Sequence, residues 1–322
     1  MRANLASIMP QVLAVWAEEA GHEVHFVCYT GVEDLSKELP ADLDMLFISA
    51  FTRSAHIAYA LSSMCRAQGC ITVLGGPHAR CYPDDAQRYF DYVLGITDRA
   101  LVEDVLNDCT QHRPVGICLS ANSQPQHLPG VQERWKFVSA TLAKTPTRIK
   151  FVPMIGSLGC PYRCSFCIDS KVDYQPLEYQ QISDDLKFLQ TKLARPTVAW
   201  HDPNFGVRFD DYLSLIEEAS PEGKLSFVAE SSLSLLSEKN SKRLGAAGCI
   251  AILPGIESWF DMGNKSGTGL RQGEEKVLEV SAQVNMILKH IPYLQANFVL
   301  GLDGDEGAAP FELTKKFIDL TP

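Results

Sequence analysis

Three closely spaced cysteines constrain this chain more than any other feature of its sequence. Cys160, Cys164 and Cys167 occur with the spacing C-x₃-C-x₂-C, directly after the apolar, partly β-branched stretch 149–155. Such a stretch is typical of a buried strand. The cysteines are therefore expected on a loop that leaves the carboxyl end of that strand, which is the end where α/β barrels carry their catalytic groups.

The three thiolates suit an iron–sulfur cluster better than a zinc ion. Three cysteines on one short loop can ligate three irons of a cubane cluster, and Cys249 is too far along the chain to be a local fourth ligand. One iron would then stay open to a small molecule. The alternative is a structural zinc site with a distant fourth ligand. Zinc sites usually pair C-x₂-C with a second C-x₂-C or a histidine pair, and the sequence has neither.

This motif, with Phe166 before the third cysteine, resembles the radical S-adenosylmethionine (SAM) superfamily. The resemblance implies a [4Fe-4S] cluster held by Cys160, Cys164 and Cys167, with SAM bound to the open iron and Phe166 beside it. It also implies reductive cleavage of SAM to a 5′-deoxyadenosyl radical, with electrons from a donor such as flavodoxin or ferredoxin. The substrate would be a small molecule or a peptide.

The composition limits the partners and the compartment. A chain of 322 residues, 46% hydrophobic and 21% charged, is long enough for two globular domains. A net charge of −10 argues against a nucleic-acid partner. The sequence has no apolar run of membrane-spanning length and does not open with a signal-peptide pattern. We expect a cytoplasmic protein with reduced thiols, because an oxygen-sensitive cluster needs a reducing compartment.

Apolar strands alternate with helices in the first third of the chain. Strands are expected at 22–29, 45–49, 71–74 and 92–94, and helices at 11–20, 32–39, 54–68 and 98–108. This alternation predicts a parallel sheet covered on both faces. Residues 113–145 are punctuated by proline and are expected to connect this sheet to a second domain.

Open parallel sheets bind ligands at the carboxyl ends of their strands, and two such ends stand out. Ser49 to Thr52 follows one strand, and Gly75 to Pro77 follows the next. Taken alone, the paired glycines are as compatible with a tight turn as with a ligand lying against the backbone. The stretches FISAFT and LGGPHA resemble the cobalamin-binding domain that precedes many radical SAM domains. The resemblance implies cobalamin contacts from Ser49, Thr52, Gly75, Gly76 and Pro77.

The nearby histidines are expected to be surface or hydrogen-bonded residues rather than cobalt ligands. His78 follows the glycine pair directly and is the most obvious of them. The sequence lacks the D-x-H-x-x-G motif that supplies an axial histidine in some cobalamin proteins. We therefore expect cobalamin binding without a histidine ligand from the protein.

Strand-then-helix units recur from the cysteine loop onwards. Strands are expected at 149–155, 197–200, 225–229, 249–253 and 295–300, with helices at 184–193, 210–219, 235–247, 274–289 and 310–320. This pattern predicts a barrel or a partial barrel. The partial barrel of the radical SAM family has six strands and five are expected here. The sequence therefore predicts either a fragment or a barrel shortened after the fifth strand.

Polar residues follow several of these predicted strands. A carboxylate can accept hydrogen bonds from an ammonium group and from ribose hydroxyls, although each residue alone is equally compatible with a helix cap. The segments HDPNF, GIES and FVLGLDGD resemble SAM-contacting segments of the family. The resemblance implies a SAM site that includes Asp202, Asn204, Ser231, Glu257 and Gly301.

Together these expectations describe one α/β chain. Residues 1–112 would form a Rossmann-like domain of the cobalamin-binding type, 113–145 a linker, and 146–322 a partial (β/α)6 TIM-type barrel. The resemblance implies a radical SAM enzyme that methylates an unactivated carbon with the help of cobalamin. Two alternatives stay open: a cobalamin-independent cyclase or rearrangement enzyme, and an inert, truncated iron–sulfur module.

Overall fold

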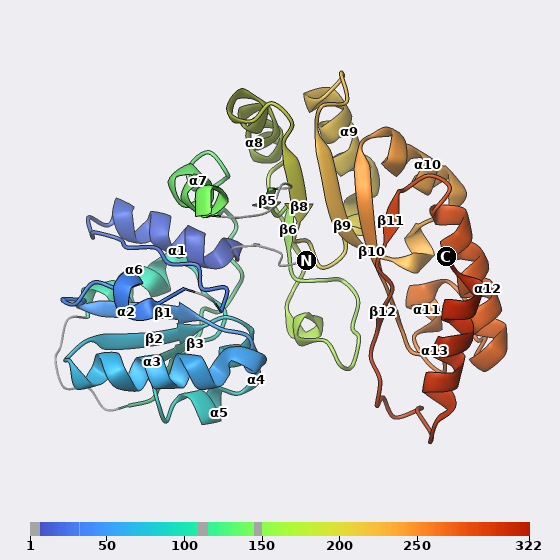
Figure 1. Cartoon of the computed structure of the whole chain (residues 1–322). Coiled ribbons are helices and arrows are strands. Elements are labelled where there is room, and N and C mark those ends of the chain that lie inside the picture. The colour runs from blue at the N-terminus through green and yellow to red at the C-terminus, as the bar shows by residue number, and fades with distance from the viewer. Residues whose placement is uncertain (1–6, 32, 109–114, 145–149) are drawn as a thin grey trace. The chain divides into compact units, whose positions relative to one another are not determined.

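The computed structural model of the chain describes residues 7–31, 33–108, 115–144 and 150–322. The chain divides into two compact units: Met1–Thr147 with Pro161–Leu177, and Arg148–Cys160 with Glu178–Pro322 (Figure 1). Each unit is built on a parallel β-sheet with helices, which confirms the predicted α/β class. The predicted domain limits stay a prediction.

The first unit is organised around a parallel sheet with the strand order β1-β2-β3-β4. The strands are β1 (Met45–Ser49), β2 (Ile71–Gly75), β3 (Tyr92–Leu94) and β4 (Ile117–Leu119), and the short strand β7 (Gln175–Pro176) also lies in this unit. The helices are α1 (Ile8–Glu19), α2 (Leu35–Glu38), α3 (Ala55–Ala67), α4 (Pro77–Cys81), α5 (Pro83–Ala86), α6 (Arg99–Asn107) and α7 (Trp135–Lys144), with 3-10 turns η1 (Thr52–Ser54) and η2 (Ile168–Lys171).

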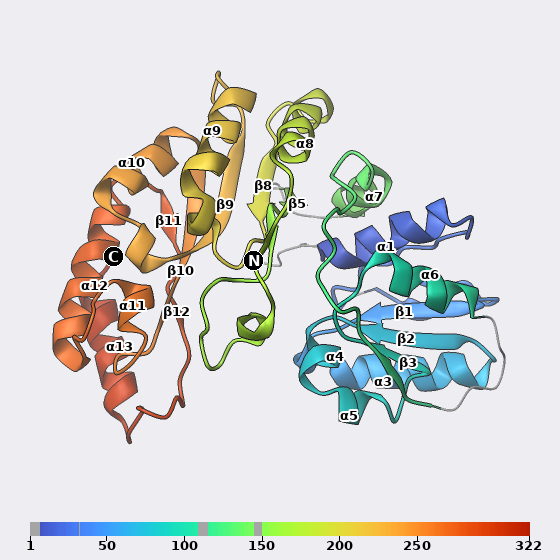
Figure 2. The ribbon, with the colours of Figure 1, turned by 180° about the vertical axis from the view of Figure 1, so that it is seen from behind.

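Alternation along the central strands explains why helices cover both faces of this sheet. Leu74 packs with Ala58 of α3 in one core cluster, whereas the preceding residue, Val73, packs with Val105 of α6 in another. Successive side chains of a strand point to opposite faces, so neighbouring residues of β2 are apolar on both faces. Figure 2 shows the same sheet from behind.

Two segments of the first unit differ from the sequence prediction. The strand predicted at 22–29 is wrong, because residues 22–30 have irregular backbone. The alternating apolar residues of this segment have another explanation, since Val24 and Phe26 pack against Phe137 of α7. In the predicted linker, β4 pairs with β3 and extends the sheet by one strand.

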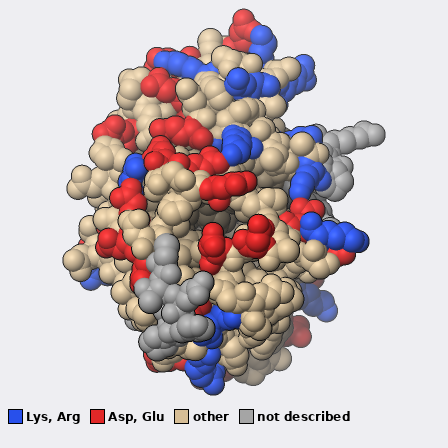
Figure 3. Space-filling view, turned by 90° about the vertical axis from the view of Figure 1, so that its left-hand side faces the viewer, with Lys and Arg blue, Asp and Glu red and all other residues tan. Residues whose placement is uncertain are grey.

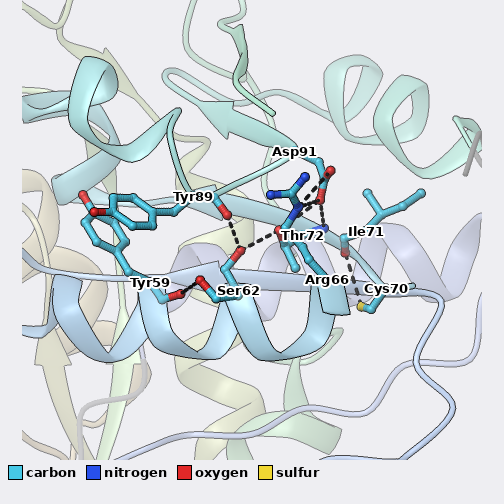
Figure 4. Close-up of polar contacts among 9 residues, drawn as sticks. Tyr59, Ser62, Arg66, Cys70, Ile71, Thr72, Tyr89 and Asp91 are labelled. Carbon is cyan, nitrogen blue, oxygen red and sulfur yellow. Dashed lines mark hydrogen bonds and ion pairs between the residues drawn. The ribbon is translucent and has the colours of Figure 1, made fainter. Parts of the chain in front are cut away.

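A polar network closes the amino ends of β2 and β3 (Figure 4). Asp91 accepts hydrogen bonds from Arg66 Nε at 3.1 Å and from the Thr72 backbone nitrogen at 2.8 Å. The Thr72 hydroxyl lies 2.7 Å from the hydroxyl of Ser62. Asp91, Thr72 and Ser62 are buried and linked by hydrogen bonds. We therefore assign this network a structural role.

The second unit contains a parallel sheet with the order β11-β10-β9-β8-β5, and β12 also pairs with β10. Its strands are β5 (Phe151–Met154), β6 (Ser157–Leu158), β8 (Thr197–Trp200), β9 (Ser226–Ser232), β10 (Cys249–Glu257), β11 (Tyr293–Leu294) and β12 (Asn297–Phe298). Its helices are α8 (Tyr179–Lys192), α9 (Phe209–Ala219), α10 (Glu238–Ala246), α11 (Gly263–Ser266), α12 (Gly273–Ile287) and α13 (Ala309–Leu320), with 3-10 turns η3 (Phe205–Arg208) and η4 (Leu233–Leu235).

Several strands of the second sheet end at other residues than predicted. Strands β9 and β10 continue to Ser232 and Glu257, so two predicted site residues, Ser231 and Glu257, lie within strands rather than after them. The strand predicted at 295–300 is reduced to β12, because its pairing with β10 is interrupted by a register shift between Gly255 and Glu257.

The surface carries more acidic than basic side chains. Figure 3 shows Asp and Glu gathered around the middle of one face, in keeping with the net charge of −10. Such a face repels a phosphate backbone. Across the residues that the structure describes, the helices are too short or too polar to span a bilayer.

Candidate cofactor sites

The three motif cysteines are accessible thiols. Cys160, Cys164 and Cys167 have partly exposed side chains, and the backbone nitrogen of Cys167 donates to the carbonyl of Cys164 at 3.1 Å, which makes a tight turn. Among the described residues, no three His, Cys, Asp or Glu side chains form a ready metal site, so the cluster stays a prediction. Burial raises the pKa of Cys70 and Cys249 to about 12, which disfavours their thiolate forms.

Asp202 organises the chain segment that leads into the cysteine loop. Its carboxylate, 1% exposed at the end of β8, accepts hydrogen bonds from the Gly156 nitrogen at 2.9 Å and the Ser157 hydroxyl at 2.6 Å. The Tyr212 hydroxyl of α9 donates to the same carboxylate at 2.6 Å. Asp202 therefore holds the backbone four residues before Cys160 against the neighbouring strand end.

We call the contacts of Asp202 with Gly156, Ser157 and Tyr212 the Asp202 clamp. Its close packing requires a glycine at position 156. A Cβ atom at this position would lie 2.4 Å from the Tyr212 hydroxyl. Arg208 completes the clamp by donating to the Gly156 carbonyl at 3.1 Å. Burial raises the pKa of Asp202, and the hydrogen bonds from Ser157, Tyr212 and Gly156 oppose that effect.

Asn204 joins the ends of β8 and β9. Its amide donates to the Ser232 hydroxyl at 2.7 Å, and its carbonyl oxygen accepts from the Ser232 nitrogen at 3.0 Å. Ser231 is buried beside this pair, and a Cβ on Gly206 would lie 2.7 Å from its hydroxyl oxygen. Strand pairing sets Ser232 opposite Gly255, so the predicted residues of β8, β9 and β10 share one edge of the sheet.

Glu257 ends β10 in a strained conformation. Its φ of +66° lies in the left-handed region, which is uncommon for residues other than glycine. The side chain is buried and forms an ion pair with Lys265 of α11. Gly255 leaves room for this pair, since a Cβ there would lie 2.0 Å from Glu257 Oε1. A second cation, Lys276, is fully buried nearby, and burial lowers its pKa to about 8.

Two further predicted SAM-site residues lie on loops. Phe166 sits between the second and third cysteines and is 37% exposed, so its ring is accessible. Gly301 follows β12 with a φ of +89°. Its backbone nitrogen donates to Asp305 at 2.7 Å, which orders the turn.

The predicted cobalamin residues come together at the ends of β1 and β2. Ser49 pairs in register with Gly75, the Ala50 nitrogen donates to the Gly75 carbonyl at 3.3 Å, and the Ala50 carbonyl accepts from the His78 nitrogen at 3.0 Å. Gly76 has a φ of +85°, and a Cβ there would lie 2.6 Å from the Ser49 hydroxyl oxygen. Pro77 then begins α4.

His78 and Thr52 are linked beside this turn. Nδ1 of His78 lies 3.3 Å from the Thr52 hydroxyl, and Nε2 lies 2.6 Å from the Tyr59 hydroxyl. Both ring nitrogens therefore have partners within the unit, which confirms that His78 is a hydrogen-bonded histidine.

The partners of the candidate residues were not visible in the sequence. Ser157, Tyr212, Arg208 and Lys265 belong to no motif, and Ser157 and Asp202 are 45 residues apart. Only the folded sheet brings them together. The one available signal was Gly156, a glycine just before the cysteine loop, which indicates close packing but does not identify Tyr212 as the partner.

The fold is that of solved cobalamin-dependent radical SAM proteins. The radical SAM methyltransferase TsrM from Kitasatospora setae, described with cobalamin and a [4Fe-4S] cluster bound, superposes with a TM-score of 0.68 at 13% identity, over 98% of this chain and 70% of that one. The cobalamin-dependent SAM radical enzyme OxsB superposes with a TM-score of 0.61 at 15% identity, over 97% of this chain and 49% of that one.

Two curated relatives are methyltransferases of Chlorobaculum tepidum. The bacteriochlorophyllide d C-12(1)-methyltransferase is 25% identical over 281 residues, which cover 85% of this chain and 60% of that protein. The C-8(2)-methyltransferase is 28% identical over 240 residues, covering 67% and 50% respectively. The chain thus spans about half to three fifths of the length of these relatives. No protein-family model matches it. The likeness to the two solved structures shows that this chain has their fold.

Proposed function

We propose that this chain is the cofactor-binding part of a radical SAM methyltransferase that also uses cobalamin. The observation that carries the proposal is the position of the cysteine motif. It follows β5 of a parallel sheet whose neighbouring strand ends bring Asp202, Asn204 and Glu257 to one edge. The names of both curated relatives support methylation as the outcome. The substrate is a small molecule or a peptide.

The donor set at the cysteine loop fits an iron–sulfur cluster. Cys160, Cys164 and Cys167 supply three accessible thiols, and thiolates are the usual ligands of such clusters. When bound, the cluster supplies the electron for reductive cleavage of SAM, drawn from a donor such as flavodoxin or ferredoxin. Asp202 and Arg208 fix Gly156 and so hold the start of the loop. Asp202 thereby positions the cluster loop in addition to its predicted contact with SAM.

Glu257 is the residue we assign to SAM orientation. Its buried carboxylate pairs with the Lys265 ammonium, and a carboxylate has further lone pairs that can accept hydrogen bonds from an ammonium group or from hydroxyls. The strained backbone fixes the direction of this side chain. Asn204, Ser231, Phe166 and Gly301 complete the proposed SAM contacts.

The glycine turn after β2 fits a large ligand. Gly75 has open space where a side chain would begin, and the adjacent ends of β1 and β2 form the crevice that parallel sheets use for ligands. Ser49, Thr52, Gly75, Gly76 and Pro77 would contact the cobalamin there. We propose that the first sheet is a Rossmann-like cobalamin domain and the second a partial TIM-type barrel, in a cytoplasmic protein.

The test is production of 5′-deoxyadenosine. Anaerobically reconstituted protein, reduced with dithionite and given SAM, should release this product, and the Cys164→Ala variant should not. An intact cluster without the product would favour the inert iron–sulfur module. Product formation by protein that elutes free of corrinoid after incubation with hydroxocobalamin would favour the cobalamin-independent enzyme.

A further inference from the structure

A chain of hydrogen bonds runs from the exposed Thr52 into the first unit. It passes from the Thr52 hydroxyl to His78 Nδ1 at 3.3 Å, and from His78 Nε2 to the Tyr59 hydroxyl at 2.6 Å. Tyr59 then donates to Asp85 at 2.7 Å. His78 is 3% exposed and Tyr59 is 8% exposed, so water does not compete for the hydrogen bond between them.

The donor and acceptor of each hydrogen bond in this series can be assigned by starting from Asp85. The Asp85 carboxylate also contacts the guanidinium of Arg88, which favours its ionised form, and an ionised carboxylate only accepts hydrogen bonds. Burial raises the pKa of Tyr59, so its hydroxyl stays protonated and donates a hydrogen bond to Asp85. The Tyr59 oxygen is left to accept a hydrogen bond from His78 Nε2.

The remaining protons follow from the charge of His78. Burial, with a smaller contribution from His56, lowers the pKa of His78 from 6.5, so the ring is neutral at pH 7 and carries one proton. With that proton on Nε2, Nδ1 can only accept. The Thr52 hydroxyl therefore donates to Nδ1, and its oxygen has lone pairs but no proton to offer to a ligand.

We propose that Thr52 is an acceptor-only contact that selects an N–H donor, such as an amide, over a phosphate oxygen. The inference rests on the proposed corrinoid site, to which Thr52 and Gly76 belong. A corrinoid offers both chemistries, with amide side chains around its ring and a phosphate in its nucleotide tail. The hydrogen-bond chain excludes the phosphate, and we assign Thr52 to a ring amide rather than to a hydroxyl of the nucleotide tail.

The tautomer of His78 tests the proton count without any ligand. In protein labelled with 15N-histidine and measured at pH 7, the resonances that disappear in a His78→Gln variant belong to this residue. We expect the neutral ring with its proton on Nε2. The Tyr59→Phe variant removes the acceptor and should shift the ring away from this tautomer. A proton on Nδ1 in the unchanged protein would overturn the proposal.

Binding of two corrinoids tests the ligand assignment. Cobinamide keeps the ring amides of cobalamin and lacks the nucleotide tail with its phosphate. Thr52→Val should weaken hydroxocobalamin and cobinamide alike, by about 2- to 10-fold, as expected for one neutral hydrogen bond. Thr52→Ser should bind both like the unchanged protein. A loss confined to hydroxocobalamin would overturn the assignment.

The two measurements separate this inference from the proposed function. Unchanged protein that binds neither corrinoid would overturn the corrinoid site and the ligand assignment together. The tautomer of His78 would still confirm or refute the proton count in that case.

Discussion

The strand ends of the two units are built in different ways. In the first unit, β1 and β2 end at Ser49 and the Gly75–Gly76 turn, and the neighbouring Phe51 is 60% exposed. In the second unit, the ends of β8 and β10 carry buried Asp202 and Glu257, each already bonded to other residues. The first arrangement provides space beside the backbone for a bulky ligand. The second provides charges and loops that are held in place before a ligand arrives.

The largest expected effect concerns the cysteine loop. Cys164→Ala should abolish the iron content and the visible absorbance of anaerobically reconstituted protein, because one of three thiolate ligands is lost. The matched control is Cys249→Ala, since burial raises the pKa of that thiol to about 12 and it is a packing residue. A full cluster in the Cys164 variant would contradict the assignment of the motif.

The sequence was a good guide to the strands and to the glycine-rich strand ends. Apolar runs identify β1, β2, β3 and β8 nearly to the residue, because strands covered on both faces are mostly apolar along their length. The alternating apolar residues at 22–29 led to the prediction of a strand that is not present. These apolar residues pack against α7 without pairing, and alternation does not distinguish these two kinds of burial.

The sequence was a poorer guide to what the polar site residues contact. It placed Asp202 and Glu257 at strand ends, but the partners of both come from elsewhere in the fold: Ser157 lies 45 residues from Asp202, and Lys265 lies on α11. Such pairs depend on packing in three dimensions and leave no periodic pattern. The extra strand β4 was missed although β3 is equally short, because the residues of β4 are only partly buried and β3 is buried throughout.

The next effect would test whether the second unit's strand end is a prebuilt clamp. Asp202→Asn should lower the free energy of unfolding by about 2–3 kcal/mol, because the amide presents a donor where buried donors need an acceptor. Urea unfolding measures this change. Asp319→Asn, on the exposed surface of α13, is the control and should be nearly neutral.

The pH dependence of the Asp202 clamp has a definite sign. Burial raises the pKa of folded Asp202 above its unfolded value of 3.8, so the folded state holds that proton more tightly. The contribution of this bound proton to the free energy of unfolding is present at low pH and is lost as the pH rises through the folded pKa. The gap between the unchanged protein and the Asn variant should therefore narrow as pH rises above about 4. A gap that widens would show that the hydrogen bonds outweigh burial.

A smaller effect distinguishes ligand binding from structure at the neighbouring strand end. Glu257→Ala should leave the cluster intact and weaken SAM binding by about 10- to 100-fold, the effect of losing a hydrogen bond to a charged group. Titration of the reconstituted protein with SAM, followed by its spectral change, gives the dissociation constant. Glu275→Ala, on the exposed face of α12, should bind SAM normally. An unchanged constant in the Glu257 variant would make this residue a structural partner of Lys265.

The smallest effect tests whether the open strand end of the first unit also helps to order the cysteine segment. Pro161–Leu177 belongs to this unit, and Arg80 of α4 donates to the Ile168 carbonyl at 3.2 Å and to Asp169 at 3.1 Å. Both charged side chains are about a quarter exposed. Arg80→Gln should therefore cost about 1 kcal/mol or less.

Hydrogen exchange of peptides covering 161–177 should become up to about 5-fold faster in the Arg80→Gln variant, the equivalent of that energy. The reversed pair, Arg80→Asp with Asp169→Arg, should restore part of the protection, because it re-forms the ion pair without the bond to Ile168. Arg99→Gln removes a more exposed ion pair of α6 and should leave these peptides unchanged. Equal exchange in the Arg80 variant and the unchanged protein would mean that the segment is ordered from elsewhere. The glycine-lined strand end would then provide space for a ligand without ordering the cysteines.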